Sequence, residues 1–352
     1  MFSTTNRRKR GGVVYYLALF LIKMSWKPTS NQETRLLRAK MNRDIREFFY
    51  QRNVLEVETP ALSQAGNTDP FIQSFQTPSL SLGIALDRYL HTSPEYPMKR
   101  LLAAGSGDIY QLCKVWRKEE SGKNHNPEFT LLEWYRIGFS TKELMLEVSE
   151  LLHFLLAPLL PSLSQNNKMI SYEQLFLEKF ELNPHIANQE ALQKLQKLIN
   201  TFIPSLNTAD LDHQAMLDAL LTHCIEPDFD KDGLTFVYDY PASQSALAKI
   251  NKRDDNTQVA MRFEVYLGQS ELGNGYQEET NYQRNCSILQ NENTQRKQIG
   301  LAQVTQDKHF LEAAKRGIPE SAGVAIGLDR VLMLMADVDS IQKVINFPWD
   351  VA

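Results

Sequence analysis

One short stretch of the sequence collects side chains that can hold anions and cations together. Arg117-Lys118-Glu119-Glu120 is followed by the run His125 to Glu133, which reads His-Asn-Pro-Glu-Phe-Thr-Leu-Leu-Glu. An arginine forks onto a carboxylate or a phosphate, a ring such as Phe129 stacks on a base, and a carboxylate such as Glu133 meets an ammonium group. This combination of side chains favours a nucleotide triphosphate bound beside a cationic small molecule. An Arg-x-Glu pair alone is more typical of a surface ion pair.

The positions within this stretch suggest a division of roles. Arg117 and Glu119 stand two residues apart at the end of a predicted strand, so they share one face. There Arg117 bridges a carboxylate and a phosphate, which lowers the repulsion between two anions about to react. His125 and Asn126 follow a Ser-Gly-Lys-Asn loop, from which we expect them to reach the outer phosphates.

Two glutamates flank a predicted hairpin turn. Glu264 and Glu271 lie on either side of Gly268-Gln269, a two-residue turn between two strands. If the paired residues have an odd index sum, both carboxylates project from the same face. Adjacent carboxylates repel unless a proton or cation lies between them, and Mg²⁺ is bound by one or two carboxylates plus substrate phosphates. We therefore predict an Mg²⁺ site at this pair, with a solvated acidic hairpin as the alternative.

A third segment, Gly273-Asn274-Gly275-Tyr276-Gln277-Glu278, combines glycines with polar side chains. Its glycines allow the backbone to approach a ligand closely, and Tyr276 and Glu278 alternate onto one side. With Glu133 and Tyr135 they form an acidic pocket with an aromatic wall. Such a pocket suits a long ammonium side chain, although a simple turn would also explain the glycines.

A fourth segment near the C-terminus alternates small and apolar residues. It reads Gly323-Val324-Ala325-Ile326-Gly327-Leu328-Asp329-Arg330. The small residues clear space above a predicted strand, and Arg330 at the start of the following helix can contact phosphate. The Gly-x-Ala-x-Gly pattern alone is weak evidence for a site.

Hydrophobic periodicity and turn signals predict the elements that carry these residues. Predicted helices are Arg35–Phe49, Phe139–Leu160, one capped by Ser171, Gln189–Leu221, Leu301–Lys315 and Asp329–Met335. Predicted strands are Val54–Pro60, Leu86–Leu90, Ile109–Trp116, Leu234–Tyr240, Met261–Leu267, Glu271–Tyr276 and Gly323–Leu328. We expect an α+β fold, with one mixed, mostly antiparallel sheet flanked by helices, a loop over the site at 61–78, and a helical insertion at about 140–232.

Composition narrows the functional class. The chain has 352 residues, 43% hydrophobic and 23% charged, with a net charge of -4, which is ordinary for a globular protein and argues mildly against a dedicated RNA binder. Its three cysteines show neither a disulfide framework nor zinc spacing, so we expect a reducing, cytoplasmic location.

The N-terminus carries a basic cluster and a short apolar run. Residues 7–10 are basic and residues 13–22 largely apolar, but no small-x-small cleavage site follows and the run is too short to span a bilayer. We interpret residues 1–23 as an upstream extension outside the fold, with the catalytic domain at 24–352. Five of the 38 basic residues lie in that extension, which leaves 33 basic against 42 acidic residues, a net charge of -9. A membrane or targeting role is the alternative.

The segments in this order resemble the three motifs of class II aminoacyl-tRNA synthetases. The predicted helix and strand ending at Pro60 resemble motif one, Arg117 to Glu133 motif two, and Gly323 to Arg330 motif three. Thr92-Ser93-Pro94-Glu95, the His-Asn-Pro-Glu-Phe-Thr run and Gly-Asn-Gly-Tyr are similar to the lysyl branch. The resemblance runs from about residue 27 to the C-terminus and implies the class II catalytic fold.

Two departures from the lysyl synthetases point to a related family. About ten residues separate Met24 from the first predicted helix, too few for the anticodon-binding barrel that those synthetases carry there. Ala325 stands where they have glycine. Together with residues 236–245, which read Phe-Val-Tyr-Asp-Tyr-Pro-Ala-Ser-Gln-Ser, these features are similar to the bacterial elongation factor P–lysine ligase family, whose members attach (R)-β-lysine to a lysine of elongation factor P.

The resemblance implies a role for each candidate residue. Arg117 and Arg330 are the implied catalytic residues, and Arg117 contacts both the substrate carboxylate and the α-phosphate. The residues implied to hold ATP are Arg117, Glu119, His125, Asn126, Phe129 and Arg330. The residues implied to bind Mg²⁺ are Glu264 and Glu271. The residues implied to hold (R)-β-lysine or lysine are Glu95, Glu133, Tyr135, Asn274, Tyr276 and Glu278, with Ala325 shaping the pocket floor.

The resemblance further implies a homodimer built on motif one, elongation factor P as protein substrate, no stable tRNA binding and no membrane association. Two other functions stay open from the sequence. One is a truncated lysyl-tRNA synthetase that charges tRNA, and the other is a non-catalytic paralogue that binds ATP in a regulatory role.

Overall fold

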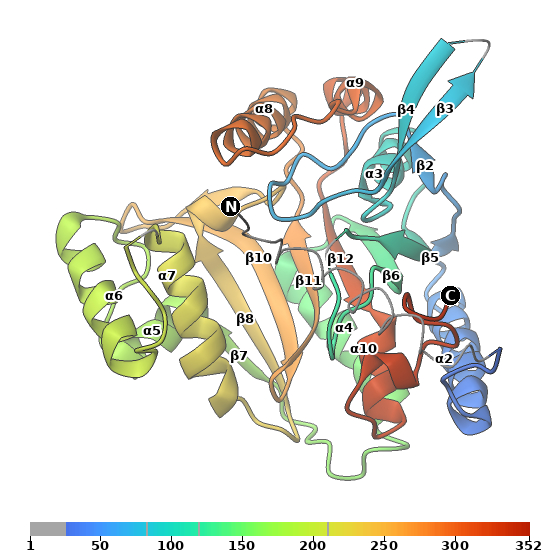
Figure 1. The fold of residues 1–352 in the computed structure, drawn as a ribbon, viewed down its shortest axis with the longest axis horizontal. Coiled ribbons are helices and arrows are strands. Elements are labelled where there is room, and N and C mark those ends of the chain that lie inside the picture. Colours follow the sequence, from blue (N-terminus) through green and yellow to red (C-terminus); the bar gives the residue numbers. More distant parts are fainter. Residues whose placement is uncertain (1–25, 82–83, 119, 210) are drawn as a thin grey trace, which may run out of the picture.

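The computed structural model describes residues 26–81, 84–118, 120–209 and 211–352. The proposed extension at 1–23 and Glu119 therefore lie outside the described residues. Figure 1 shows a large twisted sheet through the middle of the molecule, α5 to α7 beside one edge, α2 beside the other, and the β3–β4 hairpin extending away from the body. The predicted α+β fold with one mixed sheet is confirmed.

The main sheet has the strand order β1-β5-β6-β12-β11-β10-β8-β7, with β9 pairing to β10. Its pairs are antiparallel except β1 with β5 and β7 with β8, which are parallel. A separate three-stranded sheet has the order β2-β4-β3. The strands are β1 (Leu55–Glu56), β2 (Leu62–Ser63), β3 (Gln76–Ser81), β4 (Ile84–Leu90), β5 (Ile109–Trp116), β6 (Glu128–Ile137), β7 (Lys168–Ser171), β8 (Leu234–Pro241), β9 (Ile250–Lys252), β10 (Gln258–Leu267), β11 (Ser270–Gln277) and β12 (Ser321–Gly327).

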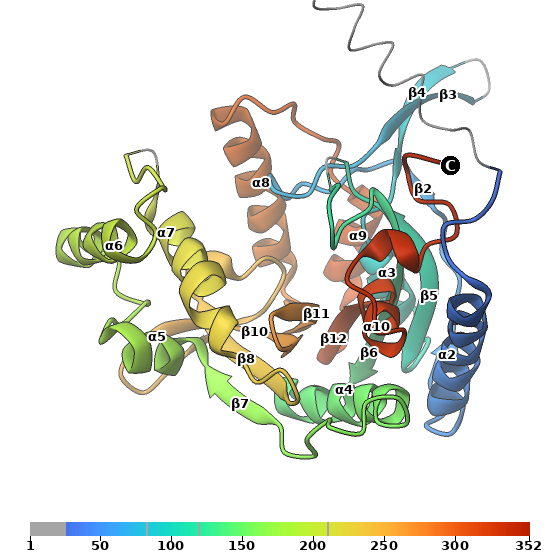
Figure 2. The same cartoon turned by 60° about the horizontal axis from the view of Figure 1, so that its bottom comes forward.

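The helices cover the faces and edges of this sheet. They are α2 (Gln32–Tyr50), α3 (Glu95–Ala103), α4 (Thr141–Leu156), α5 (Tyr172–Phe180), α6 (Gln189–Phe202), α7 (His213–Leu220), α8 (Tyr282–Gln298), α9 (Lys308–Arg316) and α10 (Leu328–Met335). The apolar faces of α2, α4 and α10 pack on the sheet and form the main core around Trp134. Figure 2 shows α4 and α2 beneath the sheet, with the polar helix α8 at a distance from them. No helix in the described part of the chain has the length and apolar character to cross a bilayer.

The predicted helical insertion at 140–232 divides into two parts. Helix α4 belongs to the main core, whereas α5, α6 and α7 form a second apolar cluster against Val237, Tyr240 and Ala260 of the sheet. The segment also contains β7, which the sequence did not predict. Ser171 caps α5 as predicted, since its hydroxyl accepts a hydrogen bond from the Gln174 amide at 3.1 Å.

Two predicted elements are wrong in their extent. The strand expected at Val54–Pro60 is reduced to β1, because only the stretch near Leu55 pairs with β5. The helix expected from Leu301 begins at Lys308, after the Asp307 cap. Before it, the amide and carbonyl of Val304 bond the side chain of Asn293 at 2.9 and 3.0 Å, so this backbone is satisfied without helix formation. Helices α3 and α8 and strands β2, β3, β6, β7 and β9 were not predicted.

Candidate active site

The register of four central strands places most of the predicted residues on one face of the sheet. Glu133 of β6 pairs with Ala325 of β12, which pairs with Asn274 of β11, which pairs with Glu264 of β10. Directly opposed residues in an antiparallel sheet project from the same side. This first row therefore joins an acidic end, an alanine floor and one of the predicted metal ligands.

A second row runs parallel to the first. Tyr135 pairs with Gly323, Gly323 with Tyr276, and Tyr276 with Arg262. A Cβ on Gly323 would lie 2.4 Å from a ring carbon of Tyr135 and 2.5 Å from a carboxylate oxygen of Glu278. Glycine at this position thus makes room for two predicted substrate-binding side chains.

The glycines of the third segment have a different role from the predicted one. A Cβ on Gly275 would lie 2.5 Å from the ring of Phe263, and one on Gly273 would lie 2.2 Å from the carbonyl oxygen of Ala325. Both positions are glycine because neighbouring strands and a core ring occupy the space. The interpretation that they let a ligand approach the backbone is corrected accordingly.

Glu133 lies at the centre of a buried acidic cluster. It is 3% exposed and accepts hydrogen bonds from the hydroxyls of Ser93 and Tyr135, both at 2.7 Å. Burial, together with the charge of Glu95, raises the pKa of Glu133 to about 8. Glu278 is 1% exposed, and burial raises its pKa to about 7 against the opposing effect of Lys99. A cation that binds beside two buried carboxyl groups with raised pKa values stabilises their charged forms, so this cluster favours a cationic ligand.

Lys99 is a member of this cluster that sequence reasoning missed. Its ammonium lies 2.6 Å from a carboxylate oxygen of Glu95 and 2.5 Å from one of Glu278. The one sequence signal for the contact was the spacing of four residues between Glu95 and Lys99, which brings the two side chains together on a helix, but helix α3 was itself not predicted. Glu95 is itself placed by Ser93, whose hydroxyl accepts a hydrogen bond from the Glu95 amide at 3.0 Å.

Arg330 is anchored at the opposite end of the site. It donates to the carbonyl of Glu271 at 2.7 Å and to Nε2 of His125 at 2.7 Å. His125 therefore accepts as a neutral ring, in agreement with burial and the Arg330 charge, which lower its pKa. The neighbouring Asp329 fixes the helix start, because it accepts from the Thr130 amide at 2.6 Å and pairs with Arg38 of α2.

Arg117 is held more loosely than Arg330. Its guanidinium donates to the Thr92 carbonyl at 3.4 Å and lies 3.5 Å from Glu120, with the Phe129 ring 5.1 Å away. These long contacts leave its fork free for a carboxylate or a phosphate.

Asn126 is buried and already engaged with the backbone. Its amide nitrogen donates to the Glu128 carbonyl at 2.6 Å, and its oxygen accepts from the Trp349 amide at 3.0 Å. The side chain therefore ties the loop before β6 to the C-terminal segment. This contact positions His125 next to Arg330.

The predicted metal pair lies at an irregularity of the β10–β11 hairpin. Near the turn Tyr266 pairs with Glu271, an odd index sum as the same-face arrangement requires, while Glu264 pairs with Asn274 beyond a register shift. Burial and then the Glu264 charge raise the pKa of Glu271. Glu264 accepts from the Tyr240 and Tyr266 hydroxyls at 2.6 and 2.5 Å.

Glu226 is a further acid beside this pair that no sequence signal marked. Burial and the charges of Glu264 and Glu271 raise its pKa to about 7. Burial and neighbouring carboxylates thus raise the pKa of both Glu226 and Glu271, and a hard cation bound beside them would stabilise their charged forms. Of these acids Glu271 lines the smaller cavity, whereas Glu264 is paired with Arg262 at 2.5 Å. No group of three or more metal-ligating side chains gathers in the described part of the chain, so an Mg²⁺ ion here would take most of its ligands from the substrate phosphates.

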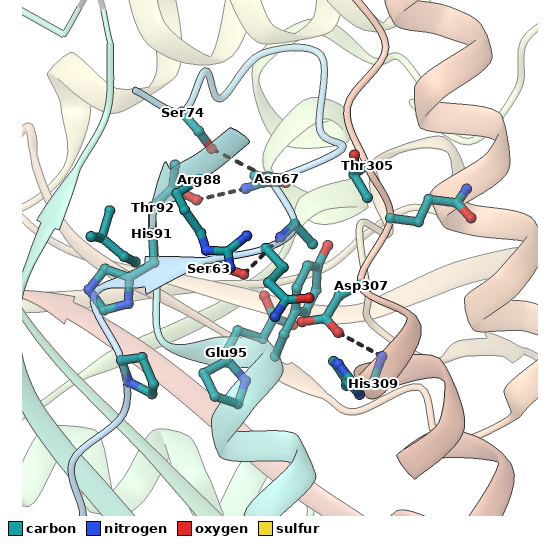
Figure 3. A pocket seen from close by; sticks show the side chains of 18 of the residues that line it. Ser63, Asn67, Ser74, Arg88, His91, Thr92, Glu95, Thr305, Asp307 and His309 are labelled. Carbon is teal, nitrogen blue, oxygen red and sulfur yellow. Dashed lines mark hydrogen bonds between the residues drawn. The ribbon is translucent and has the colours of Figure 1, made fainter. Parts of the chain in front are cut away.

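Two cavities border the site, and Arg117 on the wall of the smaller one donates to the carbonyl of Thr92 on the wall of the larger one. The smaller, about 230 Å³, is lined by Arg117, His125, Phe129, Glu271 and Arg330, together with Asn274 and Ala325 of the first row. The larger, about 740 Å³, lies between the predicted loop at 61–78, α3 and the segment before α9. Figure 3 shows Glu95 at the start of α3 beside this larger cavity, with Asn67 bonded to Thr92 across it. Glu95 thus links the amine cluster to the larger cavity, whereas the two arginines line the smaller one.

The fold and these two rows of residues define a class of protein. The sequence model of the family described as tRNA synthetases class II (D, K and N) matches residues 22–351, so the chain belongs to this family.

Individual relatives indicate which members of this family the chain resembles. The chain is 44% identical over 324 residues to the elongation factor P–(R)-β-lysine ligase of Pseudoalteromonas translucida, 43% over 327 residues to that of Vibrio cholerae, and 41% over 325 residues to that of Pectobacterium atrosepticum. Each alignment covers 92% of this chain and 97–98% of the relative. The expected resemblance is confirmed.

Proposed function

We propose that this chain is an ATP-dependent ligase that activates (R)-β-lysine, or lysine, as an adenylate and transfers it to a lysine of elongation factor P. The observation that carries the proposal is the row of Glu133, Ala325 and Asn274 between an acidic cluster and a cleft lined by Arg117 and Arg330. This arrangement occurs in a chain 41–44% identical to three elongation factor P–(R)-β-lysine ligases.

In the first step the substrate carboxylate attacks the α-phosphate of ATP, and the bond to pyrophosphate breaks. Arg117 contacts both the carboxylate and the α-phosphate, so it reduces their repulsion and aligns them. Arg330 and His125 hold the outer phosphates, Phe129 stacks on the base, and Asn126 holds this loop in place. Glu119 completes the ATP-binding set as an expectation from sequence.

Glu264 and Glu271 are the proposed Mg²⁺ ligands. When bound, the ion would neutralise charge on the ATP phosphates. The chain's own part is to keep the two carboxylates close, through the Tyr240 and Tyr266 hydroxyls and through Arg330 on the carbonyl of Glu271.

The amines of the substrate lie at the acidic end. The residues proposed to hold them are Glu95, Glu133, Tyr135, Asn274, Tyr276 and Glu278. In the second step an amine of the acceptor protein attacks the carbonyl of the adenylate, the bond to the phosphate oxygen breaks, AMP leaves and an amide forms. The acceptor ammonium first loses a proton, to a base or to the departing phosphate.

Motif one supplies the proposed dimer interface. Four apolar side chains along α2 and the following strands are exposed, with Leu36 and Tyr50 61% and 78% accessible and Leu55 and Leu62 about half. Such a row favours burial against a second copy. Sedimentation should give a species of twice 40.4 kDa, and a single 40.4 kDa species at micromolar concentration would contradict the dimer.

The decisive experiment is a transfer assay with the full chain. ATP is supplied with lysine or (R)-β-lysine, elongation factor P and tRNA are offered as acceptors, and intact protein mass is measured. A mass gain on elongation factor P, larger with (R)-β-lysine, supports the proposal. Label on tRNA instead identifies a synthetase, and ATP binding without pyrophosphate release identifies a regulatory paralogue.

A further inference from the structure

Lys99 is a charged side chain in a place where lysine is rare. It belongs to α3 and has no solvent-exposed surface, although lysine is almost never fully buried without a partner. Burial alone would favour the neutral amine. The charges of Glu278 and Glu95 outweigh this effect and raise the pKa of Lys99 above its usual value, so the ammonium stays charged.

The contacts of Lys99 join two parts of the site. Glu95 lies one turn earlier on α3, at 2.6 Å, and Glu278 follows the last residue of β11, at 2.5 Å. A single ammonium therefore fixes the start of a helix against the end of a central strand. Removing one partner of such a buried pair leaves an uncompensated charge.

The charges of the cluster do not balance. Glu95, Glu133 and Glu278 are three carboxylates, and Lys99 is the cation in contact with them among the described residues. Of the nearby arginines, Arg262 is paired with Glu264 at 2.5 Å, and Arg117 lines the cavity at the phosphate end of the site. With all three acids ionised, the cluster lacks two positive charges. A lysine-type substrate carries two ammonium groups.

We propose that Lys99 is a positioning and specificity residue: it holds Glu95 and Glu278 in place and sets the charge of the cluster so that a substrate with two ammonium groups fits and one with a single ammonium group does not. This inference rests on the proposed function, because it assumes that the cluster receives the substrate amines.

Proton exchange should accompany binding. The pKa of Glu133 is raised to about 8 and that of Glu278 to about 7, so part of the cluster is protonated at neutral pH and must lose protons when a dication arrives. The other titratable groups that interact with Glu95, Glu133 or Glu278 are Tyr96, Cys113, Tyr135, Tyr276 and Glu292. Loss of the Lys99 charge would make ionisation of Glu278 harder and shift binding to higher pH.

The test compares Lys99→Met with Lys99→Arg, which keeps the charge. Lysine-dependent pyrophosphate exchange is measured from about pH 6 to about pH 9, with norleucine as the substrate that lacks the second ammonium group. For Lys99→Met we expect a KM for lysine at least about tenfold higher, an ATP KM within about twofold of wild type, and a pH profile moved to higher pH. Discrimination against norleucine should fall, and Lys99→Arg should recover much of each effect.

A structural role alone would give a different result. Lys99→Met would then lower the thermal midpoint and kcat but leave the lysine KM, the pH profile and the norleucine discrimination unchanged, and this outcome would overturn the proposal. If the single variant fails to fold, Lys99→Met with Glu278→Gln removes both charges. In that double variant two carboxylates and no ammonium remain, so the cluster again lacks two positive charges, and the proposal expects folding and discrimination against norleucine to return together; folding without discrimination contradicts it.

Calorimetric titration with lysine in two buffers of different ionisation enthalpy separates this proposal from the proposed function. Wild-type chain should bind lysine with proton release in the absence of ATP, and Lys99→Met should bind more weakly. Intact lysine binding without exchange would reject the ligase function alone. Equal lysine affinity in wild type and Lys99→Met would reject the role of Lys99, and absence of binding in wild type would reject both.

Discussion

At the amine end of the site Glu133 and Glu278 are almost fully buried and have partners within 2.7 Å, whereas at the phosphate end Arg117 keeps a quarter of its side chain exposed and its contacts measure 3.4 and 3.5 Å. The amine end is built on paired strands and on α3. The phosphate end is built partly on the loop before β6, which includes His125 and Asn126.

This difference suggests how the two substrates are recognised. A small dication needs a preformed, desolvated site, because discrimination comes from buried groups that only the right ligand satisfies. A triphosphate is large and multiply charged, so arginines on adaptable segments can close on it. We expect changes at the amine end to alter specificity and stability, and changes at the phosphate end to alter rate.

The largest expected effect is at the phosphate end. Arg117→Ala removes the charge proposed to act on both reacting anions, so pyrophosphate exchange should fall by about 10²–10³-fold or more with little change in thermal midpoint. Arg316→Ala is the matched control, since that arginine is 79% exposed at the end of α9. A loss below about tenfold for Arg117→Ala would place the catalytic charge elsewhere.

At the amine end, Glu133→Gln should raise the KM for lysine by about 10- to 100-fold, as expected for loss of a hydrogen bond to a charged group. Exchange kinetics at saturating ATP measure this change. An equal loss of kcat with unchanged KM would contradict a role in amine binding.

The same variant should be more stable than wild type. The Glu133 carboxyl has a pKa of about 8 in the folded chain and 4.5 as its ordinary value, so the folded state holds a proton that the unfolded state releases, and stability falls as pH rises through this interval. The advantage of Glu133→Gln should therefore grow from about pH 4.5 to about pH 8 and then stay constant, as followed by thermal melts. Glu312→Gln, on an exposed face of α9, is the matched control.

A smaller change is expected at the floor between the two ends. Ala325→Gly removes one methyl group beside Glu133 and Asn274, and the preference for (R)-β-lysine over lysine should shift toward lysine by about 1–3 kcal/mol. The ratio of kcat/KM for the two substrates measures the shift. An unchanged ratio would remove Ala325 from the specificity determinants.

The smallest effect is expected from Phe129→Leu. Loss of stacking on the base should raise the KM for ATP by roughly 1 kcal/mol, about fivefold, without altering the KM for lysine. Equal changes in both constants would indicate a general disturbance of β6.

The sequence was most informative where apolar periodicity and side-chain chemistry agreed. Residues Ile109–Trp116 form β5 as predicted, and the hairpin around Gly268 forms with both acids beside it. It was least informative where polar contacts replace apolar ones. Helix α8 was missed because its buried stripe includes Asn285, Asn293 and Arg296, which bond to the backbone of neighbouring loops instead of forming an apolar face.

Charged members of the site were missed for a related reason. Lysine side chains are usually exposed to solvent, so nothing in the sequence indicated that Lys99 is buried. Only the fold brings Glu278 into contact with it. Glu226 lies after α7, far in sequence from Glu264, and its proximity depends on how α7 packs beside β8 and β10. A local sequence pattern predicts which motif residues share a strand or a hairpin. It does not predict contacts between side chains on elements far apart in the sequence.

The position of β12 has a consequence for how the protein is made. This last strand of the chain lies between β6 and β11, in the middle of the main sheet. A nascent chain therefore exposes the open edges of β6 and β11 until residues past Gly327 have emerged, and such edges invite pairing with other chains. Assembly of the polar rows is a late and non-local event, which slows folding. Loss of the final segment during synthesis would remove the floor of the pocket along with Arg330.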